Sequence, residues 1–223
     1  MGRNADGKQM MANTLLGKLF GKASAFKVQD MTDIVFDLEG TLVPHDYPFA
    51  LWTEIVRTLE WLKEEQNVGI LPLRGSPSGE NTLLSRRSKL ILRVPAERAA
   101  QATRLTGQQL KIGDSLLKVG KGKERVLQPA TTLHSHMVES SLGEVEFIAD
   151  MQKKLLKMNI SCNLICDKYR KISGTQGVLT GFGLVLHDLN PEASLQIQRT
   201  GLGGARNFGC GIFVPFKVIT GLE

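Results

Sequence analysis

Residues 201–211 read GLGGARNFGCG, so five glycines fall among eleven residues around one arginine. Glycine reaches positive φ values and lets another backbone come close, so such a loop can direct consecutive amide N–H groups at phosphate oxygens. Arg206 would add positive charge to the same site. The pattern predicts a phosphate-binding loop, and a tight bulged turn without a ligand is the alternative. The residues expected at the phosphates are Gly201, Gly203, Gly204, Arg206, Asn207, Gly209, Gly211 and, further on, Lys217.

The flanking sequence separates this loop from two common nucleotide-binding motifs. In the dinucleotide fingerprint GxGxxG, Arg206 stands where the third glycine belongs, and the following IFVPFK (212–217) reads as a strand instead of a helix. The GK[ST] end of a Walker loop does not occur in the chain. Neither motif explains the loop.

Outward from the loop, hydrophobic periodicity alternates twice between strands and helices. Ile34, Phe36 and Leu38 alternate as in a half-buried strand, and apolar residues at three- and four-residue spacing then predict a helix over 48–62. The remaining expected elements are strands at 68–73, 90–94 and within 110–119, a helix at 95–105, then strands at 131–138, 164–172, 178–186 and 212–218 with helices at 144–158 and from Asn190 onward.

The order strand, helix, strand, strand, helix, strand is that of a ferredoxin-like domain. We therefore expect an α+β protein with two tandem ferredoxin-like domains, at 30–127 and 128–223. The boundary follows a basic, glycine-containing stretch at 120–125. Residues 1–29 are polar and basic and are predicted to form a flexible extension, with a short amphipathic docking helix as the alternative.

The composition makes a polyanion a plausible partner. The 223 residues include 28 Lys and Arg against 22 Asp and Glu, a formal charge of +6. Positive charge speeds encounter with nucleic acid, although a solvated basic face without a ligand has the same composition. Three cysteines are too few for a disulfide framework, which indicates a reducing cytoplasm. The apolar stretches are too short to cross a membrane, so no membrane partner is expected.

The segment from Ser194 to Lys217, SLQIQRTGLGGARNFGCGIFVPFK, resembles the carboxy-terminal signature of the CRISPR-associated repeat-RNA endoribonucleases of the RAMP superfamily, especially their MYXAN-subtype branch. ILPLRG (70–75), LLSRRSKLILRVP (83–95) and TGQQLKIG (106–113) resemble that branch as well. The likeness runs from about Asp33 to Lys217. It implies two tandem ferredoxin-like domains and cleavage of precursor CRISPR RNA within each repeat.

The resemblance also implies a reaction without metal or other cofactor. An activated ribose 2′ hydroxyl attacks the adjacent phosphate and leaves a 2′,3′-cyclic phosphate and a 5′ hydroxyl. Proteins of this family often stay on the 3′ handle of the guide RNA within a CRISPR effector complex. The implied partners are therefore CRISPR repeat RNA, the guide RNA 3′ handle and the other subunits of such a complex.

Cleavage of this kind needs a base, an acid and positive charge at the phosphate. His45 is expected to be the base, because it lies in the turn before the first helix, where the family generally carries its histidine. A gapless match on Ala50 and Leu51 instead places Tyr47 at the histidine position, which makes Tyr47 the second candidate. This departure from the family pattern also suits a chain with weakened cleavage.

The other histidines have weaker claims. His134 and His136 are two residues apart on a predicted strand and share one face, a spacing that can hold a metal ion, contact RNA or pack within the sheet. No third ligand of fitting pattern accompanies them, so no metal site is expected. His187 ends an apolar strand and is expected to be structural.

The main basic cluster outside the loop is Ser85-Arg-Arg-Ser-Lys89, with Arg93 beyond it. It is predicted to lie on a hairpin arm, with Arg87 and Lys89 on one face and Arg86 on the other. A basic arm can follow the phosphates and 2′ hydroxyls of an A-form RNA hairpin. A solvated edge strand that uses charge to avoid aggregation is the alternative.

Three functions remain open on the sequence. The first is an enzyme that cleaves repeat RNA and keeps the product. The second is a guide-RNA-binding subunit of the same lineage with weakened or lost cleavage. The third is an unrelated tandem ferredoxin-like protein whose glycine-rich loop binds a small phosphate metabolite.

Overall fold

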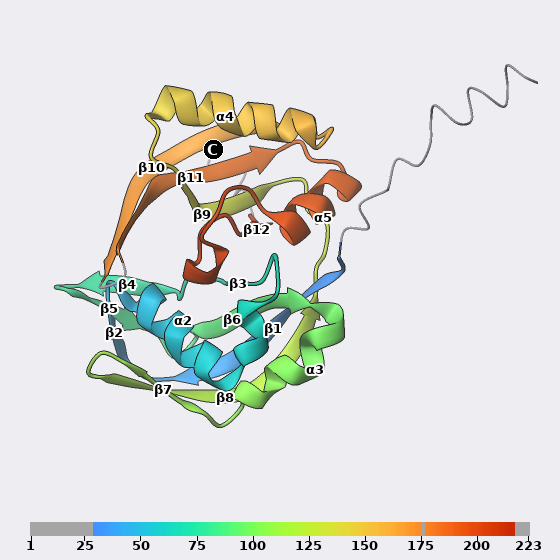
Figure 1. Cartoon of the computed structure of the whole chain (residues 1–223). Coiled ribbons are helices and arrows are strands. Elements are labelled where there is room, and N and C mark those ends of the chain that lie inside the picture. The colour runs from blue at the N-terminus through green and yellow to red at the C-terminus, as the bar shows by residue number, and fades with distance from the viewer. Residues whose placement is uncertain (1–28, 175–176, 217–223) are drawn as a thin grey trace, which may run out of the picture.

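The computed structural model describes residues 29–174 and 177–216. Lys217 and nearly all of the expected 1–29 extension lie outside the described residues. Within the described part, one sheet uses strands from Met31 to Val126 and a second uses strands from Leu133 to Pro215. The two sheets form two stacked lobes (Figure 1).

The first sheet is antiparallel and follows the predicted ferredoxin-like topology. Its spatial order is β3 (Gly69–Ile70), β6 (Lys89–Pro95), β1 (Met31–Glu39), β8 (Ser115–Val126) and β7 (Gln109–Ile112). The crossing helices are α2 (Tyr47–Thr58), followed by η1 (Glu60–Lys63), and α3 (Ala99–Ala102), flanked by η2 (Ala96–Arg98) and η3 (Thr103–Leu105). β7 is an addition at the sheet edge. Among the other four strands, β1 is the first in sequence and lies between β6 and β8, as the split βαβ arrangement requires.

The second sheet repeats this arrangement. Its order is β10 (Asn163–Gly174), β11 (Gly177–His187), β9 (Leu133–Glu139) and β12 (Val214–Pro215), with α4 (Glu144–Lys157) and α5 (Pro191–Thr200) as the crossing helices. Asn190 caps α5 through its side chain, which accepts a hydrogen bond from the backbone N–H of Ala193, and Pro191 begins the helix. The prediction of an α+β protein with two tandem ferredoxin-like folds is confirmed.

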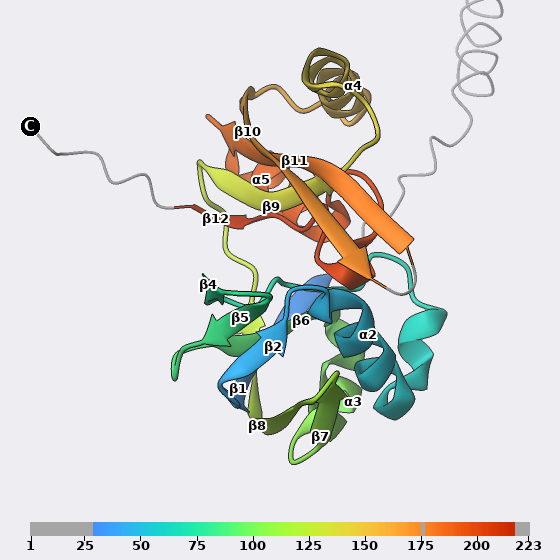
Figure 2. The same ribbon diagram turned by 90° about the vertical axis from the view of Figure 1, so that its left-hand side faces the viewer.

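A third, three-stranded sheet was not predicted. It consists of β2 (Leu42–Pro44), β5 (Asn81–Leu84) and β4 (Gly75–Ser78). These strands have three or four residues, and the β4–β5 segment GSPSGENTLL carries its apolar residues only at the end, so no alternation is visible in the sequence. The β4–β5 hairpin lies beside the first sheet, at the side of the molecule (Figure 2).

Each half has its own hydrophobic core. In the first half, Phe36 of β1 packs with Leu51 and Ile55 of α2, all at most 1% exposed. In the second half, Phe147 of α4 and Leu184 of β11 belong to a separate cluster. These cores account for the helix and strand periodicity of the sequence.

The glycine-rich loop belongs to the second half, between α5 and β12, and contacts the first half. It contains the short η4 turn (Arg206–Phe208), and the ring of Phe208 lies 4.6 Å from the ring of Phe49 on α2, measured between centroids. Gly209 has φ +89°, and a side chain there would meet Pro72. The part of the loop from Arg206 to Gly209 is therefore packed against the first domain.

Candidate functional site

A cleft of about 1040 Å³ is lined by residues from both domains. Its lining includes residues of β1, β6 and β8 from the first domain, β9 and β10 from the second, and the β4–β5 hairpin. Its only acidic lining residue among those described is Asp33, whereas six basic residues line it. These are Arg74, Arg87, Lys89, Arg125, Arg170 and Lys171. Such an imbalance concentrates positive potential in a concave surface and attracts polyanions.

Strand alternation explains how these side chains reach the cleft. On β1, Ile34 and Phe36 face the core, so Asp33 and Val35 face the opposite side and line the cleft. On β9, Leu133 and Ser135 are buried, and His134 and His136 are directed to the cleft. The cleft therefore uses sheet faces that the helices leave uncovered.

His45 lines the cleft but is held tightly by the β4–β5 hairpin. Its backbone N–H donates to the carbonyl of Glu80 at 3.1 Å. Its ring bonds to the hydroxyl of Thr82 through Nδ1 and to the carbonyl of Gly79 through Nε2, both at 3.0 Å. Because a carbonyl only accepts hydrogen bonds, Nε2 carries a proton, and in the neutral ring Nδ1 therefore accepts from Thr82. Both ring nitrogens are thus engaged within the chain.

Tyr47 has a structural role in this arrangement. Its hydroxyl accepts a hydrogen bond from the backbone N–H of Leu73 at 2.9 Å. Burial raises the pKa of Tyr47 to about 12, against the smaller lowering effect of that hydrogen bond. A phenol so hard to ionise is a poor base near neutral pH. The structure thus gives no support to Tyr47 as a catalytic base.

The basic cluster was predicted to lie on a hairpin arm, but residues 85–88 form the turn between β5 and β6, and only Lys89 lies on a strand, as the first residue of β6. The Ser88 hydroxyl accepts from the backbone N–H of Ser85 and donates to the carbonyl of Arg74, which fixes the turn between β5 and β6. Arg87 and Lys89 line the cleft, whereas Arg86 is exposed outside the lining. Arg86 is therefore separated from Arg87 and Lys89, as predicted. The cause is the turn at Arg86 and Arg87 and not the alternation of side chains along a strand.

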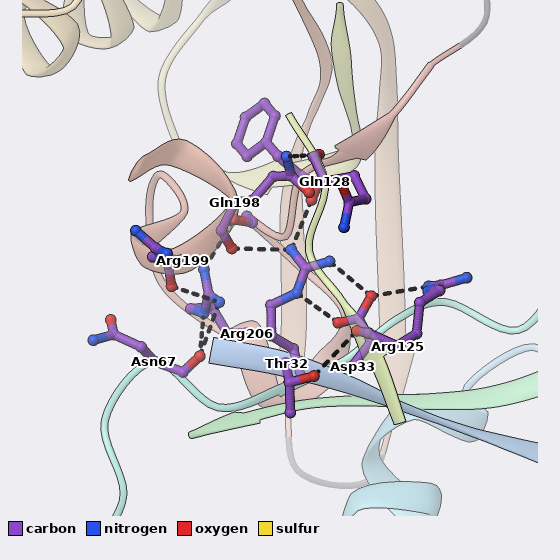
Figure 3. Close-up of polar contacts among 11 residues, drawn as sticks. Thr32, Asp33, Asn67, Arg125, Gln128, Gln198, Arg199 and Arg206 are labelled. Atoms are coloured by element: carbon purple, nitrogen blue, oxygen red, sulfur yellow. Dashed lines mark hydrogen bonds and ion pairs between the residues drawn. The ribbon is translucent and has the colours of Figure 1, made fainter. Parts of the chain in front are cut away.

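Arg93 is buried and unavailable to a ligand, contrary to expectation. Its side chain is 0% exposed and forms a bidentate pair with Asp33, at 2.8 and 3.1 Å. It also donates to the carbonyls of Gln198 and Phe213 in the second domain, at 2.9 and 2.7 Å. Arg125, from β8, donates to the same carboxylate from the cleft side (Figure 3). Arg93 therefore joins the two domains.

Arg206 is the counterpart of Arg93 from the second domain. It is 8% exposed, and its guanidinium donates to the carbonyl of Asn67 at 2.8 and 3.1 Å, with longer bonds to the carbonyls of Gly211 and Arg199 (Figure 3). The pKa of Arg206 is lowered to about 10, mainly by burial and to a smaller extent by the nearby Arg93 cation, while Asp33 opposes both effects. The expected direct contact between Arg206 and phosphate is therefore corrected to an interdomain contact.

The glycines of the loop serve this packing. Gly201, Gly209 and Gly211 are buried, and their backbone N–H groups donate to carbonyls within the chain. An added Cβ at Gly201 would lie 2.3 Å from the carbonyl oxygen of Gly211. Gly203 and Gly204 are exposed, but Gly204 lies against the carboxylate of Glu139, which disfavours a phosphate there. The buried glycines fit the alternative prediction of a tight turn without a ligand. Asn207, which was expected at a phosphate, is half-buried in the same loop.

Three titratable residues of the second domain, His134, His136 and Arg170, line the same cleft. His134 and His136 of β9 lie near Asp167 and Arg170 of β10, and Arg170 donates to the carboxylate of Asp167 at 2.8 Å. Burial lowers the pKa of His134 and of His136; Arg170 adds to this for both, and Asp167 opposes it. Both imidazoles are therefore held toward their neutral form.

Sequence reasoning missed Arg125, Arg170, Lys171 and Arg74 as lining residues. The run DKYRK at 167–171 was the available signal for two of them. The register shift between Cys166 and Tyr169, which decides their facing, is invisible in the sequence.

Within residues 29–174 and 177–216, no group of three or more His, Cys, Asp or Glu side chains is arranged to hold a metal ion. The helices described there include none long and apolar enough to span a bilayer.

Comparisons with known proteins give the chain a family. The family model described as "Cas6 Crispr" matches residues 32–218. The CRISPR-associated endonuclease Cas6 of Myxococcus xanthus is 31% identical over 185 residues, which cover 82% of this chain and 80% of that protein. Among solved structures, one described as a Cas6-related gene from Pyrococcus furiosus has a TM-score of 0.61 at 13% identity, covering 84% of this chain and 99% of that chain. A RAMP protein described as binding different RNA substrates has a TM-score of 0.59 at 14% identity, over 83% and 100% of the two chains, and supports the same fold. The chain belongs to the Cas6 family of CRISPR-associated proteins.

Proposed function

We propose that this protein binds CRISPR repeat RNA in the interdomain cleft and cleaves precursor CRISPR RNA without a metal ion. In this reaction a ribose 2′ hydroxyl attacks the adjacent phosphate, which leaves a 2′,3′-cyclic phosphate and a 5′ hydroxyl. The protein then stays on the 3′ handle of the guide RNA within a CRISPR effector complex in the cytoplasm. The relative from Myxococcus xanthus is named as an endonuclease, which supports an enzymatic role.

The observation that carries the proposal is the cleft itself. It brings together six basic side chains and three histidines, His45, His134 and His136, against one acidic residue. The acid is already paired with Arg93 and Arg125, so its charge is largely compensated. Basic residues can hold phosphates, and imidazoles can move protons near neutral pH. This combination provides the groups that metal-free RNA cleavage needs.

The test uses the purified full chain and a labelled repeat RNA in excess EDTA. We expect a single cut and a 5′ product that ends in a 2′,3′-cyclic phosphate. An RNA with one 2′-deoxy substitution at the cut position should bind with similar affinity and remain intact. Cleavage of that substituted RNA at the same bond, or cleavage only after a divalent ion is added, would overturn the mechanism.

A second candidate is a guide-RNA-binding subunit with weak cleavage. The occupied ring of His45 favours it, because both nitrogens already have partners in the β4–β5 hairpin. In the same assay, such a subunit would form a stable complex with the RNA. It would yield no products during the time in which an active enzyme cleaves all of the RNA.

A further inference from the structure

RNA cleavage needs a proton acceptor that can reach the 2′ hydroxyl, and His45 is poorly placed to act as one. Its Nε2 carries a proton donated to the Gly79 carbonyl, and its Nδ1 accepts from Thr82. A third bond, from the His45 backbone to Glu80, fixes the same turn. Abstraction of a proton by Nδ1 would require the loss of the Thr82 bond. These three hydrogen bonds give His45 a structural role, in which it fixes the β4–β5 hairpin.

We propose that His136 of β9 is the general base of this chain and that Arg170 of β10 binds the reacting phosphate. The inference rests on the proposed function of RNA cleavage. It assigns the chemistry to the second domain and leaves the basic turn at Arg87 and Lys89 on the first domain to hold the RNA.

The sheet of the second domain brings the two residues together. Its order places β11 between β10 and β9, so a side chain from β10 must cross β11 to approach His136. Gly183 of β11 provides the passage. A Cβ at this position would lie 2.5 Å from Nη1 of Arg170 and 2.8 Å from the carboxylate of Asp167.

The strand register shows where the guanidinium of Arg170 lies. Leu184 pairs with Ser135 and Phe182 pairs with Val138, with a register shift between them. Gly183 therefore lies level with His136 and Met137. Because the guanidinium of Arg170 lies over Gly183, it is next to the strand position of His136, on the face that lines the cleft.

Arg170 is fixed in this place and still has donors for a ligand. Its Nη2 donates to Asp167 and its Nη1 to the carbonyl of Lys168, each at 2.8 Å. A guanidinium has five N–H donors, so these bonds leave others for a phosphate oxygen. A cation held by its neighbours needs little reorganisation to stabilise the charge that develops on the phosphate.

His136 is the better placed of the two β9 histidines. His134 is half-buried, and its ring lies 5.4 Å from the ring of Phe216. His136 is exposed to the cleft, although the surrounding protein still lowers its pKa by burial, with Arg170 and His134 adding to the effect and Asp167 opposing it. A neutral imidazole open to the cleft is the form that a general base requires.

The proposed step conserves atoms and charge. The 2′ hydroxyl gives its proton to the imidazole of His136 while its oxygen forms a bond to phosphorus. The bond from phosphorus to the 5′ oxygen breaks, and that oxygen takes a proton from water in the cleft. The imidazolium then returns its proton to solvent, so the products are the cyclic phosphate and a 5′ hydroxyl.

The test measures single-turnover cleavage of repeat RNA by wild type and four variants, at saturating protein. His136→Ala should lower the rate constant by about two to four orders of magnitude, the usual worth of a placed acid–base group, with affinity for the 2′-deoxy RNA nearly unchanged. Added imidazole should restore part of that rate. Arg170→Ala should be slow as well and should not respond to imidazole, and Lys168→Ala is its charge-matched control.

His187→Ala is the control for the loss of a histidine. His187 lies at the end of β11, pairs with Asp188 at 2.9 Å and does not line the cleft, so this variant should cleave as fast as wild type.

A second pair of variants tests the geometry without removing a functional group. Gly183→Ala places a methyl group 2.5 Å from Nη1 of Arg170 and 2.8 Å from the carboxylate of Asp167, so the guanidinium has to leave its present position. The closest atoms belong to side chains and not to the backbone, so the fold should tolerate the change. Cleavage should slow and affinity should change little. Gly143→Ala introduces a similar contact, 2.7 Å from the Glu146 carboxylate on α4, and should leave cleavage unaltered.

The outcomes separate this inference from the proposed function. A wild type that cleaves, together with His136→Ala at the same rate, would overturn the assignment of His136 and leave the function standing. A slow His136→Ala that imidazole does not restore would assign His136 a structural role and would also overturn it. A wild type that binds repeat RNA without cleaving it would overturn both.

Discussion

Replacing Arg93 by methionine tests whether the two domains depend on one buried cation. The Arg93 side chain is 0% exposed and donates to Asp33 of its own domain and to the carbonyls of Gln198 and Phe213 of the other. Methionine fills a similar length without donating a hydrogen bond. Arg93→Met therefore keeps most of the packing and removes these bonds.

The expected loss of stability follows from what is left behind. Removing one partner of a buried ion pair costs about 3 to 5 kcal/mol. Each buried carbonyl left without a donor adds about 1 to 3 kcal/mol. Because Arg125 remains on Asp33 at 2.9 Å, the carboxylate is not isolated, and we expect a total loss of about 3 to 5 kcal/mol instead of the sum. For a chain of this size the melting temperature should fall by roughly 6 to 20 °C.

Two optical signals can follow the domains separately. Both tryptophans, Trp52 and Trp61, lie in the first domain, whereas far-ultraviolet circular dichroism reports on both. In urea, the two signals of wild type should change together, and in Arg93→Met they should separate because the domains are less strongly coupled. Arg57→Met is the control, since Arg57 is 70% exposed in its pair with Glu54 and should contribute at most about 1 kcal/mol. An Arg93→Met chain with the wild-type urea midpoint and coincident signals would show that the two domains do not depend on this cation.

Three further predictions concern the cleft and its surroundings. Replacing Arg87 and Lys89 together by alanine should weaken RNA binding and reduce the slope of log affinity against log salt concentration by about 1.4 to 1.8, the value for two phosphate contacts. Arg86→Ala should change this slope less, because Arg86 does not line the cleft. Equal changes in the two variants would show that the RNA does not bind through the cleft residues Arg87 and Lys89. Arg206→Met should destabilise the chain in urea and leave the salt slope of RNA binding as it is, because its donors are used on carbonyls inside the protein, and a reduced slope would show that it neutralises a phosphate after all. Tyr47→Phe should remove a pH dependence of stability, because the pKa of Tyr47 is about 12 in the folded chain and 10.0 for an ordinary tyrosine. Wild type keeps this contribution to the free energy of unfolding below pH 10 and loses up to about 3 kcal/mol as the pH rises from 10 to 12. A difference in urea midpoint between the two chains that stays constant across that range would contradict it.

The order of helices and strands was predictable because it depends on the local spacing of apolar residues. Alternation at Ile34, Phe36 and Leu38 and the spacing from Leu51 to Leu62 report directly which face of an element meets the core. The capped start at Asn190 is equally local. The third sheet was not predictable in this way, because its stability comes from pairing between segments whose own residues are mostly Gly, Pro, Ser and polar.

The candidate site was harder to predict because charge in a sequence does not reveal burial. Arg87 and Arg93 look alike in the run SRRSKLILR, yet one lines the cleft and the other is fully buried. The difference depends on Asp33 and on carbonyls more than a hundred residues away. Glycine density in the loop had the same ambiguity, since close approach to a phosphate and close approach to another backbone require the same residue.

The interdomain network also bears on the proposed chemistry. Arg87 and Lys89 belong to the first domain, whereas His136 and Arg170 belong to the second. The distance between the proposed RNA-binding residues and the proposed base therefore depends on how the two domains are joined. Arg93 fixes that distance from one side and Arg206 from the other, each through carbonyls of the opposite domain. A displacement of about 1 Å at a reacting centre can cost about a hundredfold in rate. Under the proposed function, we therefore expect the glycine-rich loop, which holds Arg206 against the Asn67 carbonyl, to influence cleavage through the alignment of the two walls of the cleft and not through a contact between Arg206 and RNA.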